Sequence, residues 1–237
     1  MLYAFLDDSN THASARTVTL AGYIAHKDAR SVFEQSSTAL FHETGITTFH
    51  ARKFEKRDGI FKGWTPPKQL IFATEWLNVA TANVMCGYSV TIDKAEFREA
   101  KATTRLAAEI SPIGYCFKIA LSKMCKNSAL WQQICEHGLA IVLEDGNTNN
   151  RGMLKDFQRM LLENGPLNGR VRSLETAKKN SCCAIQLADY LAYYAGQDIE
   201  TFGRSTMKRS RPMLDLALNA VPTDYSICFD FTPNPDW

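Results

Sequence analysis

Residues 138–144, GLAIVLE, form the clearest strand pattern in the chain, and they end in an acid, Glu144. The nearly unbroken apolar run indicates a strand buried on both faces, and the turn residues 145–147 (DGN) end it. Residues 2–7, LYAFLD, are a second apolar run that ends in an acid, Asp7. If the two strands are parallel neighbours, their backbones lie about 4.8 Å apart, and the two acids meet at one edge of the sheet.

Strand and helix patterns alternate through the rest of the chain. The β-branched and apolar residues 17–25 are expected to form a hairpin with 2–7. A hairpin followed by alternating elements predicts an α/β fold, a mixed sheet flanked by helices, with 84–92 as the third strand beside the hairpin. The other expected elements are a strand at 170–175, helices at 28–43, 66–81, 151–163 and about 182–200, and two or three helices within 94–136.

One domain is expected to span residues 1–237, with two segments outside the regular pattern. Residues 46–65 fit neither the helical nor the strand period and are interpreted as an irregular insertion away from the core. A C-terminal extension is expected from about residue 203, and it contains the basic stretch 204–212 (RSTMKRSRP). The helix at 66–81 is expected to bury four side chains, Leu70, Ile71, Trp76 and Leu77.

Composition excludes several classes of protein. The chain has 237 residues, 45% hydrophobic and 22% charged, and a net charge of only +2, which argues against indiscriminate phosphate binding. Its seven cysteines include no CxxC pair and no Cys/His set at zinc spacing, which indicates a reducing compartment. The N-terminus lacks the basic region of a signal peptide, and no apolar run reaches the roughly 18–20 residues of a membrane span. We expect a cytoplasmic protein with no membrane association.

A third acid lies in the helix expected at about 182–200. In the stretch CAIQLADYLAYY, Asp189 falls on the apolar face between Ala188 and Leu191, where a carboxylate needs a partner. One such acid alone is explained equally well by a salt bridge to a lysine or arginine, or by a helix-capping contact. Together with Asp7 and Glu144 at two strand ends, it favours a metal-binding carboxylate cluster.

At four places these segments resemble the domain of unknown function 3800 family, a group of bacterial and phage proteins. Each motif is weak alone, but the four occur in the family's order across residues 5–193. Two positions depart from the family pattern: Asp8 stands where the family usually has Glu, and Asn10 where it usually has Gly. The motifs are Asp7-Asp8-Ser9-Asn10, Phe49-His50, Glu144-Asp145-Gly146-Asn147 and the nine residues from Ile185 to Tyr193.

The resemblance implies a ribonuclease-H-like fold and the carboxylate arrangement of ribonuclease-H-like nucleases. In that chemistry two Mg²⁺ or Mn²⁺ ions activate water and stabilise the leaving oxygen of a phosphodiester. Asp7 would bridge the ions, Glu144 would bind one, and Asp189 would complete the set. Asp8 and Asp145 are alternates, because a one-residue register error turns a side chain to the other face.

Four further residues are candidates for substrate contacts. Lys178 and Lys179 precede the last helix and are expected near a scissile phosphate, with a solvated charge pair as the alternative. His50 is a candidate for metal binding or proton transfer, or else a structural histidine, and Gln186 lies one turn before Asp189. Two basic clusters could contact a nucleic-acid backbone or could simply be solvated: Arg52, Lys53, Lys56 and Arg57, and Lys208, Arg209 and Arg211.

Three functional hypotheses follow from these residues. The first is a metal-dependent phosphodiesterase, a nuclease that hydrolyses nucleic acid by two-metal-ion catalysis. The second is a catalytically silent ribonuclease-H-like module that binds nucleic acid or a protein partner. The third is a hydrolase of a small nucleotide. The oligomeric state and the choice between RNA and DNA do not follow from the sequence.

Overall fold

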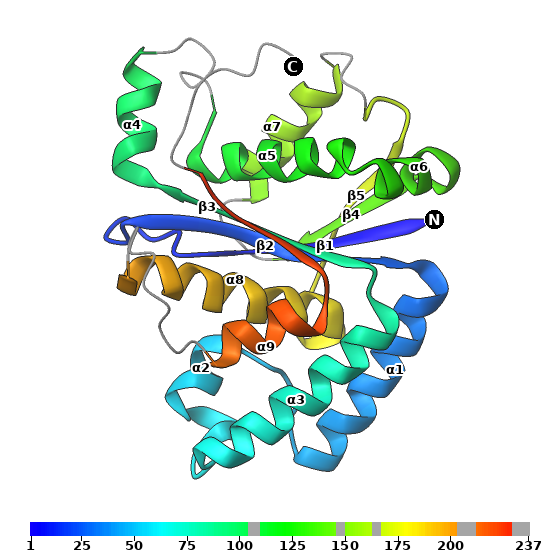
Figure 1. Ribbon diagram of the computed structural model, residues 1–237, viewed down its shortest axis with the longest axis vertical. Helices are drawn as coiled ribbons and strands as arrows, with labels where there is room; N and C mark the ends of the chain where they lie inside the picture. The colour runs from blue at the N-terminus through cyan, green and yellow to red at the C-terminus, as the bar shows by residue number, and fades with distance from the viewer. Residues whose placement is uncertain (104–109, 146–149, 163–166, 203–211, 229–237) are drawn as a thin grey trace.

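A computed structural model describes residues 1–103, 110–145, 150–162, 167–202 and 212–228. Within them, a six-stranded mixed sheet lies between two layers of helices (Figure 1). The strands stand side by side in the order β5-β4-β1-β2-β3-β6. Their bounds are β1 Leu2–Ser9, β2 Thr17–His26, β3 Cys86–Asp93, β4 Leu139–Glu144, β5 Val171–Ala177 and β6 Thr223–Cys228.

The pairing of the strands brings several strand ends to one edge. β1 is antiparallel to β2 and parallel to β4, and β2 is antiparallel to β3. β5 continues the sheet parallel to β4, and β6 continues it parallel to β3. The expected hairpin is confirmed, and so is the place of the third strand beside it; β6 was not expected. The carboxyl ends of β1, β3 and β4 and the start of β2 therefore share one edge.

The helices cover both faces of the sheet (Figure 1). α8 contacts β1 and β2 on one face, where α1, α3 and α9 pack with it, while α5 contacts β2 and β3 on the other. Where two or three helices were expected within 94–136, the structure has α4, α5 and α6. The bounds are α1 Lys27–Thr44, α2 Ala51–Lys56, α3 Pro66–Asn83, α4 Lys94–Thr103, α5 Pro112–Lys126, α6 Ser128–His137, α7 Asn150–Leu162, α8 Cys183–Phe202 and α9 Pro212–Ala220.

Alternation along the strands separates two hydrophobic cores. Tyr3 and Phe5 of β1 belong to the core beneath α8, whereas Leu2, Ala4 and Leu6 belong to the core beneath α5. This two-residue period means that an odd-numbered acid at the end of β1 lies on the side of α8.

Residues 46–65 differ from the expected insertion away from the core. They contain α2 and a 3₁₀ turn, η1 (Gly59–Phe61), and Phe49, Phe54 and Phe61 are fully buried. The rings of Phe54 and Phe61 pack edge to face with centroids 5.1 Å apart. The aromatic spacing fits no regular period because these rings fill a core made by several short elements. The segment is thus part of the core under α8.

The buried face of α3 is also partly different from expectation. Trp76 and Leu77 are buried as predicted, but Leu70 and Ile71 are 43% and 59% exposed. The Trp76 indole donates a hydrogen bond to the Ser37 hydroxyl of α1 at 3.0 Å, which orients the helix. In its first two turns α3 buries Gln69 and Phe72 instead.

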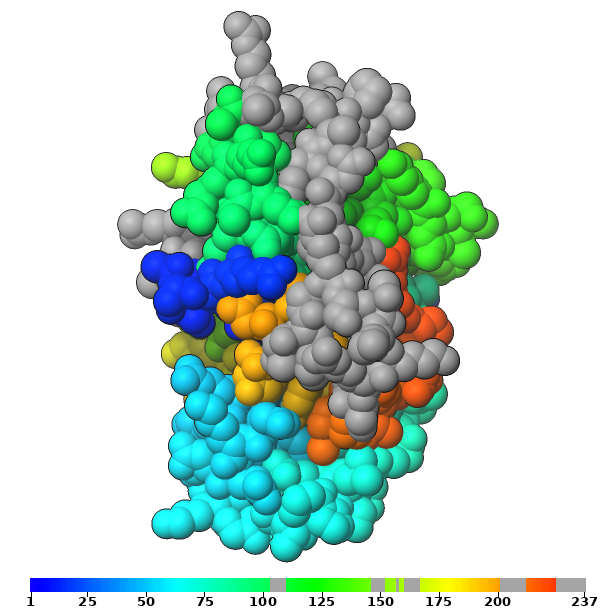
Figure 2. Space-filling view, turned by 60° about the vertical axis from the view of Figure 1, so that its left-hand side comes forward, coloured from blue at the N-terminus to red at the C-terminus, as the bar shows by residue number. Residues whose placement is uncertain are grey.

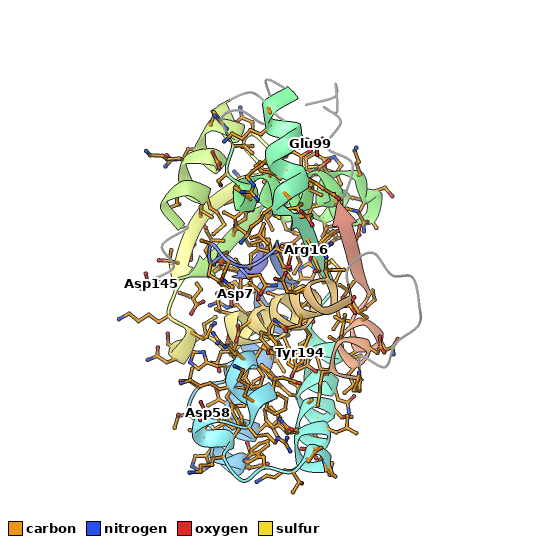
Figure 3. All side chains as sticks on the ribbon, turned by 90° about the vertical axis from the view of Figure 1, so that its left-hand side faces the viewer. Asp7, Arg16, Asp58, Glu99, Asp145 and Tyr194 are labelled. Atoms are coloured by element: carbon orange, nitrogen blue, oxygen red, sulfur yellow. The ribbon has the colours of Figure 1, made fainter. Side chains whose placement is uncertain are left out.

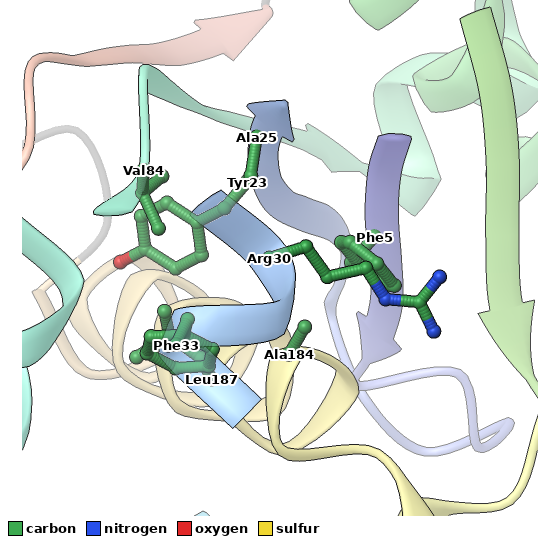
Figure 4. A pocket seen from close by; sticks show the side chains of 8 residues that line it. All are labelled: Phe5, Tyr23, Ala25, Arg30, Phe33, Val84, Ala184 and Leu187. Carbon is green, nitrogen blue, oxygen red and sulfur yellow. The ribbon is translucent and has the colours of Figure 1, made fainter. Parts of the chain in front are cut away.

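A small cavity lies within the core between β1, β2, α1 and α8 (Figure 4). Its volume is about 10 Å³, room for roughly one water molecule. Tyr23 lines it, and the Tyr23 hydroxyl has no hydrogen-bond partner among the described residues. The guanidinium of Arg30 extends from the cavity over the ring of Tyr3, at 4.8 Å from its centroid. The cavity is too small for an organic substrate.

The C-terminal part of the chain adds α9 and β6 to the fold. The basic residues Lys208, Arg209 and Arg211 lie outside the described residues, as do Gly146 and Asn147 of the third motif. None of the described helices has the length and apolar character that crossing a membrane requires.

Candidate functional site

Two of the three candidate acids stand at the ends of neighbouring parallel strands. The last residue pair between β1 and β4 is Leu6 with Leu143, and Asp7 and Glu144 are the next residues of the two strands. Phe5 of β1 and Val142 of β4 belong to the core under α8, and the two-residue period puts Asp7 and Glu144 on that same face. Parallel pairing thus places both carboxylates at one edge and on one side of the sheet.

The alternates have different environments. The same alternation assigns Asp8 to the opposite face of β1, although its backbone N–H donates to Asp7 Oδ1 at 2.9 Å. Asp145 is exposed in the turn after β4, and Figure 3 labels it beside Asp7 at the edge of the sheet. The side chains that meet under α8 are therefore Asp7 and Glu144.

The third acid reaches the same place from α8. Asp189 Oδ2 accepts a hydrogen bond from the backbone N–H of Ala51, the first residue of α2, at 2.8 Å. Asp189 Oδ1 lies 3.4 Å from Lys179 Nζ. Both alternatives considered for a single acid, the helix cap and the salt bridge, are thus present in this structure.

Lys179 is the point at which the three carboxylates meet. Its Nζ lies 3.2 Å from Asp7 Oδ2, 3.1 Å from Glu144 Oε2 and 3.4 Å from Asp189 Oδ1. The longest of these nitrogen–oxygen distances is 3.4 Å, so any two of the three carboxylate oxygens are less than about 7 Å apart. Three acids that lie far apart in the sequence, Asp7, Glu144 and Asp189, therefore surround one cation.

Burial makes this cluster electrostatically costly. Asp7 is 3% exposed, and its burial, together with the charge of Asp189, raises the pKa of Asp7 well above its usual value, although Lys179 opposes the shift. Burial disfavours the charged form of Lys179, but the charges of Asp189, Asp7 and Glu144 outweigh it and raise the pKa of the ammonium above its usual range. With all four groups ionised, the cluster carries two uncompensated negative charges.

The other predicted site residues lie close to this cluster, in different roles. Burial and the charge of Lys179 lower the pKa of His50, which keeps the ring neutral at pH 7. Gln186 is 2% exposed: its Oε1 accepts from the Phe49 N–H, and its Nε2 donates to the Lys179 carbonyl at 2.7 Å. Gln186 thus holds the backbone that carries Lys179. Lys178 is exposed next to it.

The three carboxylates of the cluster have the right oxygen ligands for a hard divalent cation, but not the spacing. In the described part of the chain, no group of three or more His, Cys, Asp or Glu side chains is arranged to hold a metal ion. The reason is geometric: oxygens surround the ammonium at 3.1–3.4 Å, whereas Mg²⁺ holds its oxygens at about 2.0–2.1 Å. A divalent cation fits here only in place of the Lys179 ammonium.

Sequence reasoning found the three acids but missed the position of Lys179 among them. The signal available was its place between β5 and α8, which indicated a phosphate contact rather than a counter-ion. A comparison with models of known protein families finds no match, and a comparison with curated proteins also finds none.

Proposed function

We propose that the protein is a metal-dependent phosphodiesterase that hydrolyses nucleic acid. The observation that carries the proposal is the convergence of Asp7, Glu144 and Asp189, from two parallel strands and a covering helix, on a single cationic position. A buried carboxylate whose pKa is raised, in a cluster of three carboxylates around one ammonium, is a site that favours binding of further positive charge.

The arrangement of the strands supports a ribonuclease-H-like fold. Five strands follow the order β5-β4-β1-β2-β3, an antiparallel meander extended by two parallel strands. The proposal of this fold comes from the resemblance to the domain of unknown function 3800 family. β6, parallel to β3 at the far edge, is an addition that departs from this fold.

Each residue of the cluster has a defined task in this proposal. Asp7, Glu144 and Asp189 would hold the cation, and Mg²⁺ or Mn²⁺ in that place would supply Lewis-acid stabilisation of the phosphodiester and an acidified water. The Lys179 ammonium, once displaced from the carboxylates, would be available to pair with a phosphate oxygen of the substrate. His50, neutral at pH 7, accepts a proton at its imidazole ring.

One observation favours a second candidate, a catalytically silent module that binds nucleic acid or a protein partner. Lys179 already supplies a cation to all three carboxylates. If its ammonium stays in place, the cluster is a structural ion-pair network that joins β1, β4 and α8, and no metal enters.

Metal binding and cleavage distinguish the two candidates. Mn²⁺ is titrated into the purified full chain by calorimetry, and labelled single- and double-stranded DNA and RNA are incubated with and without Mn²⁺. The nuclease proposal expects Mn²⁺ binding and cleavage, both lost in Asp7→Asn and Glu144→Gln. The matched controls are Asp28→Asn and Glu43→Gln, exposed acids of α1, which should behave as wild type. Absence of Mn²⁺ binding and of cleavage would refute it and leave the silent module.

A further inference from the structure

A second hollow lies at the same edge of the sheet as the carboxylate cluster. It has a volume of about 370 Å³ and is formed by residues 13–16 of the loop after β1 and by the first turns of α4 and α5. Figure 2 shows this loop, in blue, against α4, in green, on the face turned toward the viewer. Among the residues that the structure describes, the lining of the hollow carries three cationic side chains, Arg16, Lys94 and Arg98, and no acidic one.

The protein holds each cation in place while leaving part of it available. Arg16 Nε pairs with Asp93 Oδ2 at 2.8 Å, and Arg98 Nε donates to the Lys94 carbonyl at 3.2 Å. Among the described residues, both arginines make their hydrogen bonds through Nε, so their terminal nitrogens remain as donors. A guanidinium held by one nitrogen presents the others in a fork that matches a phosphate group.

Lys94 adds a partly desolvated positive charge. Its Nζ donates to the carbonyls of Asn10 and His12 at 2.7 and 2.8 Å, which fixes the loop after β1. Burial lowers the pKa of Lys94, although Glu200 opposes the shift. Glu200 itself accepts from the backbone N–H groups of Arg16 and Thr17. Lys94 thus contributes positive charge to the hollow, part of which Glu200 offsets.

The start of α5 borders the same hollow. α5 is 15 residues long and begins at Pro112, which lines the hollow. The positive end of its backbone dipole therefore borders the hollow. The buried carboxylate of Asp156 lies at this same helix start, where its Oδ2 accepts a hydrogen bond from the Ser111 hydroxyl at 3.3 Å, and it offsets part of the field of that dipole.

Strand register gives the distance between the hollow and the carboxylate cluster. Asp7 pairs with Ala21, which pairs with Ser89, and Asp93 lies four residues further along β3. Two strand spacings of ~4.8 Å across and four residues of ~3.3 Å along put about 16 Å between the Cα atoms of Asp7 and Asp93. Figure 3 shows Asp7 and Arg16 on the same edge of the sheet, facing the viewer.

We infer that this hollow binds a backbone phosphate of a nucleic-acid strand, a few nucleotides away from the phosphodiester that lies at the carboxylate cluster. The inference rests on the proposed function for the identity of the strand. A cluster with excess negative charge repels phosphates, so a cationic hollow on the same edge supplies attraction where the cluster does not. The strand would cross the sheet edge from the α8 side to the α4 side, along residues 10–16.

Binding of oligonucleotides in EDTA tests the hollow without cleavage. Fluorescence anisotropy of a labelled 20-nucleotide single strand is measured against salt for the full-length wild type, Arg98→Gln and Arg16→Gln. The matched control is Arg172→Gln, an exposed arginine near the start of β5, at the opposite edge. Arg98 is the cleaner position, because Arg16 also pairs with Asp93.

The expected result is binding about tenfold weaker in Arg98→Gln and in Arg16→Gln, with Arg172→Gln unchanged. The slope of log affinity against log salt should fall by about 0.7–0.9 for a phosphate contact that is lost. Unchanged affinity in Arg98→Gln, or no binding by the wild type, would overturn the inference. The inference would also be overturned if Arg98→Gln weakened the binding of a dinucleotide as much as that of the 20-mer, because the hollow would then be a pocket for a free nucleotide.

Failure of the proposed function gives a different pattern. If wild type binds the 20-mer, loses affinity in Arg98→Gln, and yet shows neither Mn²⁺ binding nor Mn²⁺-dependent cleavage, the phosphate site stands and the nuclease proposal fails. If Mn²⁺-dependent cleavage is present and Arg98→Gln binds as wild type, the nuclease proposal stands and the phosphate site fails.

Discussion

Lys179→Met removes the ammonium that Asp7, Glu144 and Asp189 share. At an effective dielectric constant of about 20, each contact near 3.2 Å contributes roughly 5 kcal/mol of Coulomb attraction, and the cost of burying the ammonium offsets much of the total. Removing one partner of a buried ion pair typically costs about 3–5 kcal/mol. The Lys179 side chain retains 11% exposure, so we expect a loss near the lower end, about 3 kcal/mol.

In a chain of this size, that loss lowers the melting temperature by roughly 6–12 °C. Thermal unfolding is followed by circular dichroism at pH 7.5 in EDTA, with Lys178→Met as the matched control. Lys178 is the exposed neighbour, and its side chain is not part of the ion-pair cluster. Methionine keeps most of the length of the lysine chain without its charge.

Mn²⁺ should then recover the lost stability. With Lys179 gone, the carboxylates have no competing cation, so Lys179→Met should bind Mn²⁺ more tightly than wild type and gain about 2.7 kcal/mol at a hundredfold excess over its Kd. The reasoning is refuted if Lys179→Met melts at the same temperature as Lys178→Met in EDTA. It is also refuted if Mn²⁺ stabilises Lys179→Met no more than wild type.

Four further variants test individual contacts. Asp189→Asn keeps an acceptor for the Ala51 N–H and removes one repelling charge. It should therefore melt within a few degrees of wild type in EDTA and bind Mn²⁺ less tightly. A much lower melting temperature would show that the ion pair of Asp189 with Lys179 is structural. Gln186→Ala leaves the Phe49 N–H and the Lys179 carbonyl unpaired in a buried place, so it should lower the free energy of unfolding in urea by about 2–3 kcal/mol. A variant as stable as wild type would contradict this. Phe49→Ala should cost about 3–5 kcal/mol, since the ring is fully buried, and a loss below 1 kcal/mol would place it outside the core. Glu200→Gln tests pH dependence. Although burial opposes it, hydrogen bonds from the Arg16 and Thr17 N–H groups lower the pKa of Glu200. The contribution of Glu200 to the stability of the fold is therefore present above about pH 4.3 and is lost as the pH falls through the folded-state pKa. The variant should be less stable at pH 7, and its difference from wild type should shrink in acid; a difference independent of pH would contradict this.

Local patterns determined most of the secondary structure. The apolar runs ending at Asp7 and Glu144 are strands β1 and β4, because an unbroken apolar run flanked by turn residues has few alternatives. Helix α1 ends at Thr44, and its C-cap Gly45 has a φ of 74°, the left-handed conformation that glycine adopts readily. Asn10 likewise takes a φ of 60°, the conformation that asparagine tolerates better than most residues. The three acids also follow from local reasoning, since each interrupts an apolar pattern.

Long-range packing decided the rest. Residues 46–65 have no period of their own, and their aromatic rings became core only because α2, α3 and α8 meet around them. β6 adds to the sheet by pairing with β3, a partner more than a hundred residues away, which no local pattern announces. The hollow lined by Arg16, Lys94 and Arg98 joins three segments in the same way.

The position of Lys179 illustrates the difference most clearly. In sequence it is one of two adjacent lysines, and nothing local distinguishes it from Lys178. In the fold, Gln186 holds its backbone so that its ammonium enters the cluster while Lys178 faces solvent. Sequence alone determined which carboxylates would be difficult to bury, because burial of charge is a local cost. Only tertiary structure determined which cation compensates them, because Coulomb attraction depends on distances that pairing of remote segments sets.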